Sequence, residues 1–184
     1  MIKRIVIEGA DNVGKTTVAN ILKDRFNSKS NSVKIMHFTG PPNELTQKEN
    51  FIESLNIIND FANAATNNLY ITDRDIYGEI VYGPMYRKEN PNWIWELEKC
   101  FYKLTQNSLF ILLEDTAKNS LSRDDGKSFT TKRFKRYKEI LKFRKAFRKS
   151  IIPNKYKIKI TNKTPLDVAN EITACLVISN MRKY

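Results

Sequence analysis

Short apolar runs alternate along the chain with longer segments in which apolar residues recur every three or four positions. The short runs are rich in β-branched and aromatic residues, which is typical of strands buried on both faces of a sheet. They predict five strands, at residues 2–8, 33–38, 69–73, 109–114 and 156–161. The longer segments predict helices at residues 17–26, 47–66, 93–105 and 131–150, and a last helix from Pro165 onward.

Strands that alternate with helices indicate a parallel sheet covered by helices on both faces. The chain carries no internal repeat, no linker and no low-complexity tract. We therefore predict a single α/β domain over residues 1–184, with a five-stranded parallel sheet between two helical layers. Ligands of such folds gather at the carboxyl ends of the strands, so the polar residues that follow each strand are the first functional candidates.

The segment after the first strand matches a phosphate-binding loop. Residues 9–16 read GADNVGKT, which fits the pattern G-x-x-x-x-G-K-[ST] between a strand and a helix. In such a loop the backbone N–H groups and the helix N-terminus face the phosphates. We expect Lys15 to bridge the outer phosphates of ATP and the Thr16 hydroxyl to hold Mg²⁺. The predicted ATP contacts are Gly9, Ala10, Asp11, Asn12, Val13, Gly14, Lys15, Thr16 and Thr17.

Asp73 and Arg74 stand at the end of the third strand and pair a metal-binding carboxylate with a phosphate-binding guanidinium. The planar fork of Arg74 suits a second phosphate. Asp73 is placed to hold Mg²⁺, together with Thr16, or to orient the attacking group. The alternative is a local salt bridge, or a helix start capped by Asp73 or Asp75.

A polar segment at about residues 117–136 predicts a lid, which a kinase needs to exclude water from the transferred phosphoryl group. We expect Arg123 to contact the donor and to act in catalysis. Other cations of this segment could also neutralise charge on the transferred phosphoryl group, namely Lys127, Lys132, Arg133 and Arg136. For each of them, a position on a solvated basic helix is the simpler interpretation.

Several further side chains are candidates for the acceptor site. Aromatic rings can stack on a base, with core packing as the alternative for each; they are Phe51, Tyr77, Tyr82 and Trp93. Arg87 is a candidate to reach a substrate phosphate or base. His37, the single histidine, has no partner cluster in the sequence, and a structural role is expected for it.

The bulk properties narrow the picture only slightly. The net charge of +12 suits polyanionic partners, but abundant Lys and Asn indicate an AT-rich genome. No run approaches the roughly 20 apolar residues of a membrane span, and the N-terminal run is expected to be a strand and no signal peptide. Cys100 and Cys175 lie in helical patterns and predict buried, reduced thiols of an intracellular, cytoplasmic protein.

Together these motifs resemble the thymidylate kinase group of P-loop nucleotide kinases, whose fold is a three-layer sandwich. Residues 8–17 are similar to that family's E-G-x-D-x-x-G-K-[ST]-T, which implies that Asp11 lies near the substrate sugar and the metal. Asp73, Arg74 and Tyr82 look like its D-R-[YF]…A-Y-Q segment, whose arginine grips the acceptor phosphate. Residues 113–123 and 156–172 resemble later family segments. Residues 37–42 and 82–84 look like a compact phage-type branch of the deoxynucleotide and deoxynucleoside kinase group.

The chain also departs from this family. The R-E-P that follows the family's second strand is replaced by TGP at residues 39–41, and only about 30 residues separate Pro42 from Asp73. The family's thymine-stacking aromatic and base-reading arginine belong to that shortened stretch. Position 75 is Asp where the family has an aromatic. Asn12 stands where some members carry a loop arginine, so we expect a catalytic cation from the lid.

These observations predict a Mg²⁺- and ATP-dependent kinase of a deoxynucleoside monophosphate, most simply dTMP. The expected catalytic residues are Asp11, Lys15, Asp73, Arg74 and Arg123. The expected acceptor contacts are Asp11, Phe51, Arg74, Tyr77, Tyr82 and Arg87. A deoxynucleoside kinase, a kinase of another monophosphate, and a nucleic-acid-binding or polynucleotide 5′-end kinase remain alternatives. We expect nucleotides as partners, without membrane or nucleic acid, in the cytoplasm (of the host, if viral), and the family leaves a homodimer open.

Overall fold

The computed structural model describes residues 1–38, 46–65, 67–124, 126 and 128–182. Residues 39–42, which carry part of the family comparison, lie outside the described residues, as do Thr66 and the lid candidate Lys127.

Five parallel strands form one sheet in the order β2-β3-β1-β4-β5. They are β1 (Arg4–Glu8), β2 (Val33–His37), β3 (Leu69–Asp73), β4 (Ser108–Glu114) and β5 (Asn154–Lys159). The predicted five-stranded parallel sheet is therefore confirmed. The register pairs Ile7 with Asp73 on one side of β1 and Glu8 with Leu112 on the other. The carboxyl ends of the three central strands consequently meet at one edge of the sheet.

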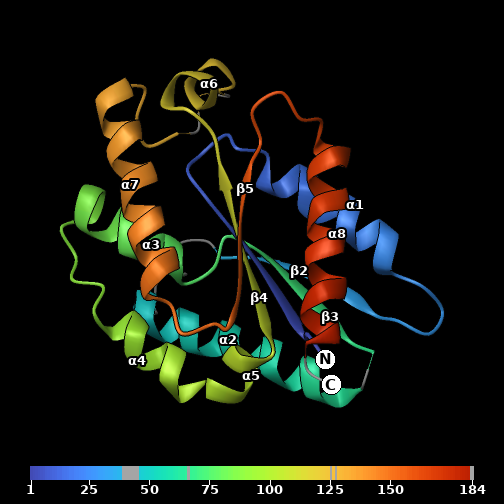
Figure 1. Ribbon diagram of the computed structural model, residues 1–184. Coiled ribbons are helices and arrows are strands. Elements are labelled where there is room, and N and C mark those ends of the chain that lie inside the picture. Colours follow the sequence, from blue (N-terminus) through green and yellow to red (C-terminus); the bar gives the residue numbers. More distant parts are fainter. Residues whose placement is uncertain (39–45, 66, 125, 127, 183–184) are drawn as a thin grey trace.

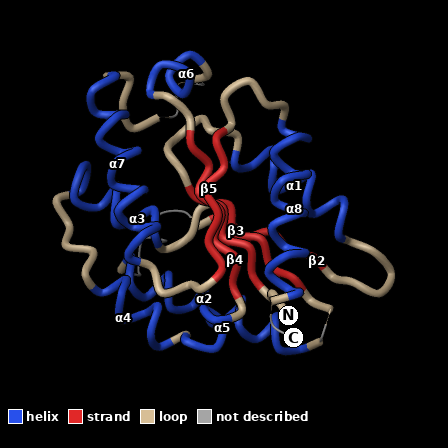
Figure 2. Tube along the Cα trace, in the orientation of Figure 1, coloured by secondary structure: helices blue, strands red, loops and turns tan. Residues whose placement is uncertain are grey.

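Helices cover both faces of the sheet, as predicted. Figures 1 and 2 show α1 and α8 on one face, with α3, α4 and α7 on the other. The helical elements are α1 (Lys15–Phe26), α2 (Gln47–Ala64), α3 (Tyr77–Tyr82), the π-helix η1 (Gly83–Arg87), α4 (Trp93–Cys100), α5 (Tyr102–Gln106), α6 (Ala117–Ser122), α7 (Arg133–Lys149) and α8 (Pro165–Met181).

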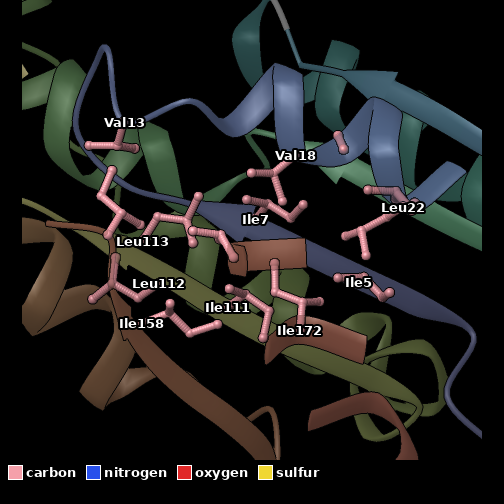
Figure 3. Close-up of a cluster of buried hydrophobic side chains, with 14 of the residues drawn as sticks. Ile5, Ile7, Val13, Val18, Leu22, Ile111, Leu112, Leu113, Ile158 and Ile172 are labelled. Carbon is pink, nitrogen blue, oxygen red and sulfur yellow. The ribbon is translucent and has the colours of Figure 1, made fainter. Parts of the chain in front are cut away.

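The strand β1 shows how alternation divides the core into two layers. Ile5 and Ile7 are fully buried in a cluster with Val18 of α1 and Ile172 of α8 (Figure 3). Val6, between them, belongs to the second cluster, which contains side chains of α2, α4 and α5. Each buried aliphatic side chain of this kind stabilises the fold by about 1.5–3 kcal/mol. Both faces of the central strand are thus dry, and ligands must approach its carboxyl end.

The single helix predicted at residues 93–105 is wrong, because the helix breaks at Phe101 into α4 and α5. The Thr105 hydroxyl donates to the Glu98 carbonyl at 3.0 Å. In a continuous helix the backbone N–H of Tyr102 would donate to the Glu98 carbonyl. At the break the side-chain hydroxyl of Thr105 donates to this carbonyl instead. The short elements α3 and η1 were not predicted, since their six and five residues are too short for a helical period to register.

The prediction of two buried thiols is half right. Cys175 is partly buried, whereas Cys100 is exposed because it is the last residue of α4, just before the break. Both are free thiols. Among the described helices none combines the length and the apolar character needed to cross a lipid bilayer.

Candidate active site

The phosphate-binding loop joins β1 to α1 and requires glycine at its first position. Gly9 has φ +150°, and a Cβ there would lie 2.5 Å from the carbonyl oxygen of Leu113 in β4. The loop therefore runs directly against the neighbouring strand. Gly14 has φ +76°, a left-handed conformation that glycine adopts without strain. It turns the chain into α1, which begins at Lys15 and points its N-terminus at the loop.

Lys15 folds back over this loop. Its side chain is buried, and Nζ donates to the carbonyl oxygens of Gly9 at 3.0 Å and Ala10 at 2.8 Å. Burial, followed by the positive charge of Arg74, lowers the pKa of Lys15 to about 8. A phosphate beside Nζ would supply the negative charge that favours the protonated amine. Lys15 is thus held in a position where a bound phosphate would pair with its ammonium group.

Glu8 is the last residue of β1 and organises the start of α3. Its Oε1 accepts from the backbone N–H groups of Asp75 at 2.8 Å and Gly78 at 2.9 Å. Burial, and then the nearby negative charge of Asp75, raises the pKa of Glu8 to about 8. A largely neutral Glu8 fixes the turn after β3 and so positions Asp73 and Arg74.

Thr16 and Asp73 are in direct contact, and His37 joins them. The Thr16 hydroxyl donates to Oδ2 of Asp73, and His37 Nδ1 lies 3.1 Å from the same oxygen. Burial alone would raise the pKa of Asp73, but the hydrogen bonds from His37 and Thr16 and the charge of Lys15 hold it below its ordinary value. A structural role was expected for His37, and the structure places it beside a predicted catalytic carboxylate.

The Thr16 and Asp73 pair fits Mg²⁺. Oδ1 of Asp73 is buried and has no hydrogen-bond partner among the described residues. An ionised carboxylate with one free oxygen beside a threonine hydroxyl is a suitable donor set for this cation, which takes one or two protein ligands and completes its shell with phosphate and water. The described residues contain no group of three or more His, Cys, Asp or Glu side chains suited to a metal, so a cage made of protein ligands alone is not indicated there.

Arg74 faces Asp11 across the top of β1. Its Nη2 lies 2.6 Å from Asp11 Oδ1, and the Tyr82 hydroxyl donates to the same oxygen at 3.1 Å. Arg74 has φ +64°, a left-handed conformation that is costly for a residue with a side chain and that gathers at functional sites. Its side chain is 30% exposed. The salt bridge left open by the sequence analysis exists, but it joins Arg74 to the phosphate loop.

The lid segment is hydrogen-bonded to the same loop. Arg123 donates through Nε to the Asn12 carbonyl at 3.0 Å, and its Nη2 lies 2.5 Å from Asp115 Oδ2. The Asn12 side chain donates to the Ser128 hydroxyl at 2.8 Å. These contacts bring the predicted lid over the phosphate loop; its role as a moving cover stays a prediction.

Arg136 is fully buried, so it is no solvated lid cation. Its Nη1 lies 3.0 Å from Glu139 Oε2 and 3.7 Å from Asp11 Oδ2. The Tyr86 hydroxyl donates to the other carboxylate oxygen of Glu139. The sequence analysis missed this network. The spacing of Arg136 and Glu139, one turn apart on α7, was its only signal in the sequence.

These groups surround one cleft of about 690 Å³. Its lining includes most of the predicted ATP contacts together with His37, Asp73, Arg74 and Arg123. It also includes residues that the sequence analysis did not consider: Ser128, Ile160, Lys163, Pro165 and Val168. Four of these five follow or begin the elements after β5. The strand-end rule that led to the other candidates would have found them, had it been applied to the fifth strand.

No protein-family model and no curated protein sequence matches the chain. Among solved structures, YorR from Bacillus subtilis in complex with phosphorylated GDP has a TM-score of 0.73 at 17% identity, covering 97% of this chain and 98% of that one. Thymidylate kinase from Candida albicans has a TM-score of 0.67 at 18% identity, covering 97% of this chain and 92% of that one.

The chain shares the fold of these two structures. The predicted thymidylate kinase-like architecture is thereby confirmed over almost the whole chain. Within this fold, the central cleft lies at the carboxyl ends of β1, β2 and β3, where its phosphate loop, Asp73 and His37 come together.

Some predicted acceptor contacts lie away from the central cleft. Phe51 packs against Phe38 and Trp93 in the core, and Tyr77 is fully buried with its hydroxyl donating to Glu98. Neither ring offers an open face for a base, so the core-packing alternative describes both.

Arg87 and Tyr82 differ in their relation to the cleft. Arg87 is paired with the buried Glu79 and with Glu89, and it does not line the cleft. Tyr82 is buried as well, but its hydroxyl bonds to the cleft residue Asp11. Tyr82 therefore helps to position Asp11 from outside the cleft. Arg87 would have to break its ion pairs with Glu79 and Glu89 to reach a substrate.

Proposed function

We propose that this protein is a nucleotide kinase that transfers the γ-phosphoryl group of ATP to a deoxynucleoside monophosphate, most simply dTMP. The observation that carries the proposal is that one cleft holds two separate anion-binding groups. The phosphate loop with Lys15 is the first and Arg74 is the second, and the pair of Thr16 and Asp73 lines the same cleft. A donor and an acceptor phosphate need this arrangement if they are to meet in line.

Separate residues of the cleft bind the donor, the acceptor and the metal. The loop N–H groups and Lys15 bind the donor phosphates, and Arg74 holds the acceptor phosphate. Asp11 orients Arg74 through their 2.6 Å ion pair. Arg123 lies along the donor, because it lines the cleft and contacts the loop at Asn12. Mg²⁺, when bound, would be held by Thr16 and Asp73 and would neutralise charge on the transferred group. Catalysis then consists of positioning and charge stabilisation.

The identity of the base is the open part of the proposal. YorR was solved with phosphorylated GDP, and the Candida albicans thymidylate kinase is described as having broad substrate specificity. The acceptor panel must therefore include purines as well as pyrimidines. A deoxynucleoside kinase is the main alternative. A homodimer, a cytoplasmic location, the phage-type branch and the absence of a nucleic-acid partner stay predictions.

The test is ADP release measured with ATP, Mg²⁺ and a panel of deoxynucleoside monophosphates and deoxynucleosides. We expect turnover with at least one monophosphate, with Lys15→Ala weakening ATP binding and turnover together. A control variant, Lys145→Ala, changes an exposed lysine of α7 outside the cleft and should match the wild type. Turnover with nucleosides alone would move the proposal to the deoxynucleoside kinases. No turnover with any acceptor, combined with unchanged ATP binding in Lys15→Ala, would refute it.

A further inference from the structure

A second hollow, of about 810 Å³, lies beside the lid helix α7 at the carboxyl ends of β4 and β5. We call it the α7 groove. It shares no lining residue with the central cleft. After β5 successive residues line one hollow and then the other, since Lys159 and Thr161 line the groove and Ile160 lines the cleft. The groove is lined by Glu114, Asp115, Thr116, Ala117, Arg133, Phe134, Tyr137, Ile140, Arg144, Lys159 and Thr161.

The carboxylates of the groove are already neutralised. Both oxygens of Glu114 accept from the guanidinium of Arg144, at 2.7 and 3.2 Å. Asp115 accepts from Arg123, from the Thr161 hydroxyl at 2.9 Å, and from other donors around it. The exposed cations Arg133 and Lys159 have no ion-pair partner within the described part of the chain. The groove therefore presents a net positive charge to an incoming ligand.

The groove also presents exposed aromatic rings. Phe134 is 67% and Tyr137 51% exposed, and they lie one turn apart on α7. Large apolar side chains that stay in water on a helix otherwise rich in Lys and Arg offer stacking surface for a planar ring. Lys138 adds a further cation, with Nζ 4.4 Å from the centroid of the Phe134 ring. Rings next to unpaired cations match a ligand that carries both an aromatic base and a phosphate.

We propose that the α7 groove is a second nucleotide-binding site that takes a mononucleotide, with its base on Phe134 and Tyr137 and its phosphate on Arg133 and Lys159. Its volume lies within the range of about 300–1,000 Å³ that is usual for small-molecule sites. Its place at the carboxyl ends of two parallel strands is where ligands of this fold class gather.

A nucleotide in this groove would act on the central cleft through Asp115. This carboxylate belongs to the groove wall, its side chain is fully buried, and its partner Arg123 lines the cleft. A phosphate in the groove adds negative charge near Asp115 and strengthens its hold on the Arg123 cation. Arg123 is then less available to the donor, so occupation of the groove raises the KM for ATP. This second step rests on the proposed function, whereas the binding step does not.

The binding step is tested by the stoichiometry of radiolabelled ADP in equilibrium dialysis. We expect two equivalents per chain for the wild type and one for Arg133→Ala/Lys159→Ala and for Phe134→Ala/Tyr137→Ala. Lys15→Ala should lose the other equivalent. Lys145→Ala, an exposed lysine of the same helix outside the groove, should retain two. All four groove substitutions are at exposed positions, so the variants should keep their fold, which circular dichroism checks.

Three outcomes would overturn the proposal. The first is a single equivalent in the wild type that Lys15→Ala abolishes. The second is a dimer that Phe134→Ala/Tyr137→Ala dissociates in sedimentation without changing the stoichiometry, which would assign the groove to a second copy of the chain. The third is displacement of ADP from the groove by a ten-residue oligothymidylate with a steep salt dependence, which would assign it to single-stranded nucleic acid. If the proposed kinase activity fails, the groove equivalent of ADP should still be measured in Lys15→Ala.

Discussion

The Thr16 hydroxyl donates a hydrogen bond to the Asp73 carboxylate, although the two residues are 57 positions apart in the chain. The parallel pairing of β1 and β3 causes this contact, because it places the phosphate loop next to the end of β3. The contact leaves Oδ1 of Asp73 buried and without a hydrogen-bond partner in the part of the chain that the structure describes. The pairing of the two strands thus prepares an anionic oxygen beside the phosphate loop before any ligand is bound.

Asp73→Asn should reduce kcat by about 10²-fold or more, because it removes the negative charge proposed to hold Mg²⁺, the cation that would neutralise charge on the transferred group. The substitution keeps the side-chain shape and one oxygen for the Thr16 hydroxyl. Binding of Mn²⁺, followed by electron paramagnetic resonance with ADP present, should weaken in parallel. A variant that loses activity but binds Mn²⁺ as tightly as the wild type would remove Asp73 from the metal site.

Arg74→Ala should raise the KM for a monophosphate acceptor by roughly 10- to 100-fold, since a hydrogen bond to a charged group contributes about 1.5–3 kcal/mol. Steady-state kinetics at saturating ATP measure this, and the KM for ATP should change little. Arg87→Ala is the matched comparison, because Arg87 is paired with Glu79 away from the cleft. An equal rise in both variants would show that Arg87 reaches the acceptor after all, as the sequence analysis expected.

Gly9→Ala should destabilise the fold by about 3 kcal/mol, because its Cβ would lie 2.5 Å from a backbone carbonyl oxygen of β4. Gly126→Ala provides the control, since Gly126 has φ +80° but an added Cβ there would meet none of the described residues within 4 Å. Its cost is the left-handed backbone alone, about 1–2 kcal/mol. Urea denaturation of the two variants separates steric overlap from backbone strain. Equal costs would mean that β4 yields to the added methyl group.

Arg136→Ala should destabilise the protein by about 3–5 kcal/mol, because it leaves Glu139 buried without its cation. Arg133→Ala, an exposed position on the same helix, should change stability by less than about 0.5 kcal/mol. Thermal denaturation measures both. A small effect at Arg136 would indicate that Glu139 becomes neutral, a change that its pKa, raised by burial, already favours.

The combined contribution of Glu8 and Lys15 to the free energy of unfolding should pass through a minimum near pH 8. The folded pKa of Glu8 is raised from 4.5 to about 8, so its stabilising contribution is present below pH 4.5 and lost as the pH rises to 8. The folded pKa of Lys15 is lowered from 10.5 to about 8, so its contribution is present above pH 10.5 and lost as the pH falls to 8.

The urea midpoint, measured across this range, tests both contributions. Glu8→Gln keeps an acceptor oxygen for the N–H groups of Asp75 and Gly78 and should flatten the fall between pH 4.5 and 8. Lys15→Met should flatten the rise between pH 8 and 10.5. Variants with the same pH profile as the wild type would show that other groups control it.

The sheet was predictable from the sequence because its three central strands, β1, β3 and β4, are buried along their whole length and are rich in apolar residues. The edge strands β2 and β5 are partly exposed, so burial on both faces does not hold for them. The five expected segments overlap the five observed strands, and their ends led to Asp73 and Arg74. The break at Phe101 was not predictable, because it depends on the Thr105 hydroxyl taking the acceptor of a backbone N–H. Local periodicity carries no information on that exchange of partners.

Side-chain pairings over long distances were the part of the site that the sequence concealed. His37 had no partner cluster along the chain, yet parallel pairing of β2 with β3 sets it opposite Asp73. Arg136 looked like one more cation of a basic helix, and only tertiary packing shows that it faces Asp11 of the phosphate loop. Residue type and position in the sequence therefore identified the candidate residues, whereas strand pairing and helix packing determine which of their side chains are in contact.

Both ends of the lid segment are attached to a single atom. The Ser120 hydroxyl donates to the Asp11 carbonyl oxygen at 2.6 Å, and Arg136 donates to the same oxygen at 3.4 Å. The chain between them leaves and returns to one point, as an Ω loop does. The closure cost of such a loop depends only weakly on its length, since doubling the length adds only about 0.6 kcal/mol. One carbonyl oxygen of the phosphate loop therefore joins α6 to α7 across the segment between them.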